Sequence, residues 1–164
     1  MTLTIALVAI LLLAAAAGTL GRSRAAGLRG SGRLNSLPFY HGAYAFLWAA
    51  VPALLLLALW APLQSRLVEQ AVLESPEGRA LPGFAMQRDS ILAEARQIAN
   101  GEIAAGFNPE STSLAPRFAE AQGRYGAIGG GVALLLAIAG AALAFRRIGV
   151  DFRARTGVER WLMA

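Results

Sequence analysis

Few side chains in this sequence could do chemistry. It contains one histidine, His41, and neither cysteine nor lysine. Without cysteine there is no thiolate nucleophile, disulfide or cysteine-based metal site. Without lysine there is no P-loop for a nucleotide. A lone histidine without an acidic neighbour indicates an interfacial polar group rather than a ligand or a proton carrier. We therefore predict no catalytic residue, no cofactor site and no metal site.

The carboxylates do not suggest a reaction either. Glu74 and Glu77 form the closest acidic pair, in a segment broken by prolines, where a cluster of charges is typical of a solvated surface. Charged residues inside a membrane usually mark an ion or proton pathway. The long apolar stretches of this chain contain none, so we expect them to line no polar path.

Three long stretches of the sequence contain no charged residue. They cover residues 1–21, 34–65 and 125–145, in a chain that is 56% hydrophobic. A helix that crosses a bilayer needs ~20 apolar residues. Lipid offers no hydrogen-bond partners, so the backbone N–H and C=O groups of such a segment must bond to each other within a helix. We predict an all-α membrane protein with three transmembrane helices and a helical exported loop between the second and third.

The arginines predict the orientation. Residues 22–41 contain four arginines and no acid, 66–124 contain six arginines and eight acids, and 146–164 contain five arginines and two acids. Short cytoplasmic loops collect positive charge. The N-terminus and the middle segment are therefore expected outside the plasma membrane. A cleaved signal peptide is the alternative for residues 1–21, but its positive charges would precede the apolar run rather than follow it.

These patterns divide the chain into six segments. They are transmembrane helix 1 (1–21), a cytoplasmic basic loop (22–41), transmembrane helix 2 (42–63), a periplasmic helical loop (64–124), transmembrane helix 3 (125–145) and a cytoplasmic tail (146–164).

The exported loop contains one clear amphipathic helix, over residues 89–99. Its apolar residues form a one-sided stripe, and Asn100-Gly101 provides a stop. Arg88 and Arg96 are expected to form surface pairs with their neighbours Asp89 and Glu94.

A second helix is expected to begin near Ser113. The Ser113 hydroxyl can cap it, and Pro116 would fall in its first turn. No proline follows up to residue 145, so this helix is expected to run unbroken into the third span.

Small residues repeat at helical spacing in two of the spans. Such spacing lets two helix backbones approach closely, although an alanine-rich chain also contains it by chance. We predict helix packing through Gly126, Gly130, Ala133 and Ala137 in the third span and through Ala45, Ala49 and Ala53 in the second.

Two short motifs carry a family resemblance. They are Ser36-Leu-Pro-x-Tyr40-x-Gly42 and Arg155-x-x-Val158-Glu159-Arg160. With the arrangement of the spans, they resemble the N-terminal region of the permease subunit PstC of phosphate-import ABC transporters, in its long bacterial form.

The resemblance implies an accessory membrane segment of a phosphate import permease in the bacterial inner membrane. The implied partners are a second permease subunit, ATPase subunits that hydrolyse ATP, and a periplasmic phosphate-binding protein. The spans themselves predict contact with membrane lipid, and the placement of the charges argues against nucleic acid. The C-terminal residues look like the opening of a further helix, where the permease core would begin. The alternative is a small non-transporting assembly or signal-input protein with an exported sensor loop.

Overall fold

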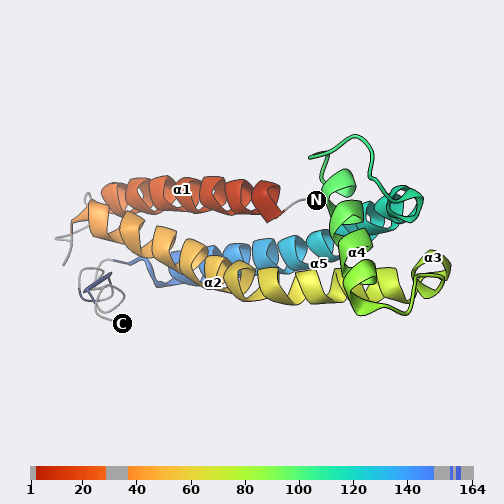
Figure 1. Ribbon diagram of the computed structural model, residues 1–164. Helices are drawn as coiled ribbons and strands as arrows, with labels where there is room; N and C mark the ends of the chain where they lie inside the picture. The colour runs from red at the N-terminus through yellow and green to blue at the C-terminus, as the bar shows by residue number, and fades with distance from the viewer. Residues whose placement is uncertain (1–2, 29–36, 150–155, 157, 160–164) are drawn as a thin grey trace. The chain divides into compact units, whose positions relative to one another are not determined.

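The computed structural model describes residues 3–28, 37–149, 156 and 158–159. Within them the chain forms five helices and no strand (Figure 1). The helices are α1 (Leu3–Leu28), α2 (Pro38–Leu73), α3 (Pro76–Arg79), α4 (Ala85–Ala99) and α5 (Pro109–Arg147). Ser36, Arg155 and Arg160 of the two motifs above lie outside the described residues.

The three long helices confirm the predicted all-α membrane fold. α1, α2 and α5 are each long and apolar enough to cross a membrane. α2 has 36 residues and α5 has 39, which correspond to ~54 and ~58 Å of helix. A hydrocarbon core is ~30 Å thick, so both helices are much longer than a crossing requires.

The chain divides into two compact units. The first, here called the membrane unit, comprises Leu3–Leu59 and Gly130–Ala164, and the second, the polar unit, is built from Trp60–Gly129. The membrane unit therefore contains α1, the first part of α2 and the last part of α5. The polar unit contains the remainder of α2 and α5 together with α3 and α4.

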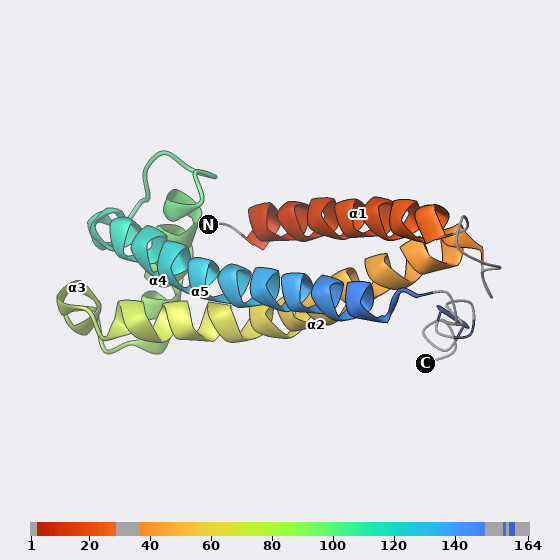
Figure 2. The same cartoon turned by 180° about the vertical axis from the view of Figure 1, so that it is seen from behind.

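Three helical segments lie side by side in the membrane unit, as both views show (Figures 1 and 2). Their shared interior consists mainly of alanine, with a few larger residues such as Ile10 and Leu57. Large apolar side chains such as Leu12, Leu59 and Leu135 point outward and are more than half exposed. Exposed leucine is the expected outer surface of a protein solvated by lipid.

The polar unit has a conventional hydrophobic core. Phe118 and Leu114 of α5 pack with Val72 of α2 and with Ile91 and Leu92 of α4. The last two residues belong to the apolar stripe predicted from the sequence. The amphipathic face of α4 is thus buried against the other helices of its own unit.

The prediction for the end of α4 is confirmed. Asn100 is the C-cap residue, and Gly101 follows with φ of +74°. This left-handed conformation has no steric penalty in glycine, which lacks a Cβ atom.

Two helices extend beyond the spans predicted for them. α1 continues to Leu28, through residues expected to form a basic loop, and α2 passes residue 63, the expected end of the second transmembrane helix, to reach Leu73. The buried side chains of Ala25 and Val72 explain both extensions, because tertiary packing overrides weak local preferences.

The starts of α4 and α5 also differ from the predictions. α4 begins at Ala85, four residues early, and α5 begins at Pro109 rather than near Ser113. Proline suits the first position of a helix, where its missing N–H is not needed. The Ser113 hydroxyl donates to the Glu110 carbonyl instead of capping. From its earlier start α5 runs unbroken into the third span, as predicted, with Pro116 inside it.

Candidate helix-packing site

The closest approach between α1 and α2 is made by glycines. A Cβ atom placed on Gly42 would lie 2.6 Å from the carbonyl oxygen of Gly18 and 3.1 Å from the Cβ atom of Arg22. One placed on Gly21 would lie 3.1 Å from the Cβ atom of Ala45. These backbones can approach this closely only because the residues between them lack side chains.

A second close approach joins α2 and α5. A Cβ atom on Gly140 would overlap the carbonyl oxygen of Trp48 and lie 3.4 Å from the Cα atom of Ala49. Both neighbours are backbone atoms of a helix, which cannot move aside as a flexible side chain can. Gly140 is therefore a position on α5 in the membrane unit where added volume is poorly tolerated.

The structure places the predicted alanines in the helix interfaces of the membrane unit. Ala45, Ala49, Ala53, Ala133 and Ala137 are all fully buried. They fall into three clusters along the bundle. One cluster brings Ala53, Ala133 and Ala137 together with Ala6, Ile10 and Leu57; a second joins Ala45 to Tyr44, Ala144 and Ile148; the third joins Ala49 to Ala14, Ala17 and Ala50.

The two predicted glycines are buried but lie in different units. Gly126 belongs to the polar unit and Gly130 to the membrane unit. Between α2 and α5 of the polar unit a close contact lies at Gly129, where a Cβ atom would overlap the indole ring of Trp60. The Trp60 indole N–H donates to the carbonyl of Tyr125 at 3.2 Å, which fixes the ring over the glycine.

Packing at Gly18, Gly21 and Gly42 was not predicted from the sequence, in which Gly140 stood only among the small residues that follow Gly126 and Gly130. A signal for the first three exists in the sequence, because Gly18-x-x-Gly21 and Gly42-x-x-Ala45 have the same spacing of small residues. Such residues three apart lie on one helix face. The alanines predicted in the second span are four residues apart, and that spacing does not include these glycines.

Tyr44 and His41 are polar residues of α2 in the membrane unit. Arg147 donates to the Tyr44 hydroxyl at 3.3 Å, and its guanidinium lies 5.7 Å from the centre of the Trp48 ring. His41, predicted to be a polar group at the membrane interface, is fully buried within the protein, with its Nδ1 atom 3.3 Å from the Leu37 carbonyl oxygen. It is part of the helix packing rather than of the surface.

In the polar unit, Glu94 ties α4 to the loop before α5. Its carboxylate accepts hydrogen bonds from the backbone N–H of Phe107 at 2.7 Å and from the backbone and side-chain N–H groups of Asn108 at 3.1 and 3.0 Å. These donors favour the charged form, and the Phe107 N–H makes the largest contribution. They hold the pKa of Glu94 at about 2, against a usual 4.5.

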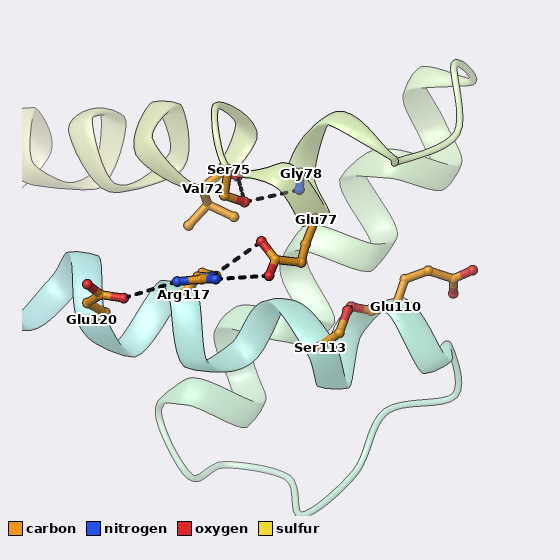
Figure 3. A network of polar contacts seen from close by, with 8 residues as sticks. All are labelled: Val72, Ser75, Glu77, Gly78, Glu110, Ser113, Arg117 and Glu120. Atoms are coloured by element: carbon orange, nitrogen blue, oxygen red, sulfur yellow. Dashed lines mark hydrogen bonds and ion pairs between the residues drawn. The ribbon is translucent and has the colours of Figure 1, made fainter.

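An ion pair links α3 and α5 on the surface of this unit. Arg117 of α5 donates through two nitrogens to the carboxylate of Glu77, at 3.0 and 3.3 Å, and lies 3.5 Å from Glu120 (Figure 3). The hydrogen bond from Arg117 is the main reason that the pKa of Glu77 lies below its usual value. Both partners are largely hydrated, so the pair contributes little to stability.

The predicted pairing of Arg96 with Glu94 is wrong. Arg96 donates to Glu69 of α2 at 3.3 Å and lies 5.7 Å from the centre of the Phe118 ring. Glu94 faces the loop instead, where three N–H groups donate to its carboxylate. Long-range contacts of this kind cannot be deduced from neighbours in the sequence.

The described residues contain no group of three or more histidine, cysteine, aspartate or glutamate side chains that could hold a metal ion. The described ion pairs and the hydrogen bonds of Glu94 lie in the polar unit, and the glycines and alanines bring helices together. The geometry is suited to holding a bundle of membrane helices.

Comparison with known proteins identifies the family. A family model described as "Phosphate ATP-binding cassette transporter" matches residues 7–164. The match covers nearly the whole chain, which therefore belongs to this family. No curated protein and no solved structure matches the chain.

Proposed function

We propose that this member of the phosphate ABC transporter family is the N-terminal accessory segment of an inorganic phosphate import permease. It contributes membrane anchoring and helix packing, and the translocation path lies elsewhere in the transporter. One observation carries this proposal: the interior of the membrane unit is filled mainly by alanine, glycine and a few larger apolar residues, and among the described residues His41 is the one side chain buried there that can carry a charge near neutral pH. An anion path would need charged or polar groups within the membrane.

The proposed setting is the bacterial inner membrane, with the N-terminus and residues 66–124 outside the cytoplasm. This orientation is supported by the arginine-rich segments at residues 22–41 and 146–164. The proposed partners are a second permease subunit, two ATPase subunits and a periplasmic phosphate-binding protein. ATP hydrolysis belongs to the ATPase subunits, and the chain itself is not an enzyme.

Substituted-cysteine accessibility in the full transporter tests whether the bundle lines the path. Ala53 and Ala137 are buried in one cluster, and cysteine is small enough to replace either. We expect a charged methanethiosulfonate reagent to leave phosphate uptake by both variants unchanged, as in the parent transporter without these cysteines. Inhibition that saturating phosphate prevents would place the path through this bundle and overturn the proposal.

A second experiment tests the orientation. Ser113 in the polar unit and Ser23 on α1 are both exposed; Ser111 is unsuitable because it is fully buried. Cysteine at 113 should react with an impermeant maleimide in intact cells, whereas cysteine at 23 should react only after permeabilisation. The reverse pattern would contradict the orientation without affecting the packing argument.

A further inference from the structure

A groove of about 360 Å³ runs between α1 and α2 near the arginine-bearing end of α1. This volume lies within the ~300–1,000 Å³ typical of small-molecule sites. Gly18 and Gly42, the glycines of the α1–α2 crossing, are among the residues that line it. Phe39 and Phe46 of α2 line one side.

The groove is apolar except at one end. Ala15 and Thr19 of α1 and Ala43 of α2 complete its lining, and the Thr19 hydroxyl donates to the carbonyl of Ala16 in its own helix. Arg22 is the one charged residue in the lining. Among the described residues, Arg22 makes no ion pair. A groove that is apolar along its length and has a cation at one end is complementary to a molecule with an anionic head and a hydrocarbon tail.

The depth of the groove in the bilayer supports the same match. The uncharged part of α1 from Leu3 to Leu20 is ~27 Å long, close to the ~30 Å hydrocarbon thickness. Arg22 then lies at the level of the lipid headgroups. Ala15 lies two helical turns deeper, ~10 Å away along the axis, at the level of the acyl chains.

We propose that this groove is a binding site for one anionic phospholipid. Its phosphate group is bound by Arg22 through charge-assisted hydrogen bonds, and the upper part of one acyl chain lies over Gly18 and Gly42 between the two phenylalanines. Electrostatic attraction supports the assignment, because residues 22–41 contain four arginines and no acid. The proposal does not depend on the role of the chain in transport.

The test uses the full transporter in nanodiscs that contain phosphatidylglycerol and phosphatidylcholine. Native mass spectrometry after partial delipidation counts the phosphatidylglycerol that remains bound. Arg22→Gln should reduce this retention by about tenfold, because a hydrogen bond to a charged group is lost. Arg24→Gln is the matched control: it removes the same charge two residues away, on a side chain outside the groove, and should change retention little.

A second pair of variants tests the shape of the site with its charge intact. Ala43→Leu fills the groove and should lower retention, whereas Ala139→Leu, on the exposed face of α5, should not. Equal losses in Arg22→Gln and Arg24→Gln would indicate diffuse attraction and overturn the proposal, as would normal retention in Ala43→Leu. Displacement of the lipid by millimolar inorganic phosphate would also overturn it, because the site would then recognise free phosphate.

Discussion

In the membrane unit the closest contacts between helices involve glycine and alanine, whereas large side chains fill the core of the polar unit. Gly42 and Gly140 bring backbones together in the first, while Phe118 and Ile91 fill the second. The difference follows from the solvent. Water drives large apolar side chains inward, but lipid is as apolar as leucine, so helices in a membrane gain most from close backbone packing. One chain thus contains both kinds of packing, and α2 and α5 contribute residues to each unit.

The polar contacts divide in the same way. The ion pairs Arg117–Glu77 and Arg96–Glu69 and the hydrogen bonds of Glu94 all lie in the polar unit. Charged groups there remain near water and lose little hydration. The spans avoid charges because burying one in lipid costs several kilocalories per mole.

The largest expected change in the free energy of unfolding comes from a substitution in the core of the polar unit. Phe118→Ala should lower the free energy of unfolding of this unit by ~3–5 kcal/mol, since it removes a fully buried ring and leaves a cavity. The change is measured by urea titration in detergent, in which unfolding is monitored through proteolysis within residues 60–129. Phe107→Ala is the control, because that ring is 100% exposed. Similar losses in both variants would contradict a water-driven core.

The next effect concerns the glycine contacts of α5. Gly140→Ala should destabilise the membrane unit by ~1–3 kcal/mol through overpacking against the Trp48 backbone. Gly131→Ala, at a site with open space around it, should be neutral or stabilise by up to ~1 kcal/mol through its greater helix propensity. Unfolding in mixed micelles, monitored by circular dichroism, compares the two. Equal shifts would mean that the membrane unit does not depend on close backbone approach.

Acid should weaken the polar unit through Glu94. Its folded-state pKa of about 2 lies below the usual 4.5, so the unfolded chain binds more protons between these values. The stabilisation is complete above pH 4.5 and is lost as the pH falls towards 2. We expect Glu94→Gln to remove this pH dependence and Glu110→Gln, on an exposed residue, to retain it. Thermal unfolding of the three proteins across this pH range tests the assignment, and an unchanged profile in Glu94→Gln would refute it.

The smallest expected effect is at the pair Arg117–Glu77. Both side chains are partly exposed, and exposed pairs are screened by salt. A double-mutant cycle of Arg117→Gln and Glu77→Gln should give a coupling energy that is small at low salt and disappears at high salt. A large coupling that persists in salt would show that this unit depends on polar contacts as well as on its core.

The elements that followed from the sequence are those with long, regular patterns. The uncharged spans gave three membrane helices, and the stripe at Ile91 and Leu92 gave α4 with its buried face. The ends of helices were less predictable. Pro62 and Ser113 are ordinary signals for the end and the start of a helix, yet both lie inside helices because burial nearby outweighs them.

The packing site was partly predictable for a related reason. Small residues at helical spacing mark a face, and five alanines predicted from the sequence are buried. Spacing alone does not show which small residue contacts the backbone of a neighbouring helix. Gly140 and Gly42 occupy those points because of where the helices cross, and the crossing depends on all the side chains in the interface.

By itself, the sequence determined the all-α membrane class and the three spans. Charge and apolar length act along the chain, and lipid imposes helix on any uncharged stretch that crosses it. Only the tertiary structure decided that Glu94 binds a loop rather than Arg96, that His41 is buried, and that α1 and α2 cross at Gly18 and Gly42. Those outcomes depend on groups distant in the sequence, and their positions become known only when the helices are packed.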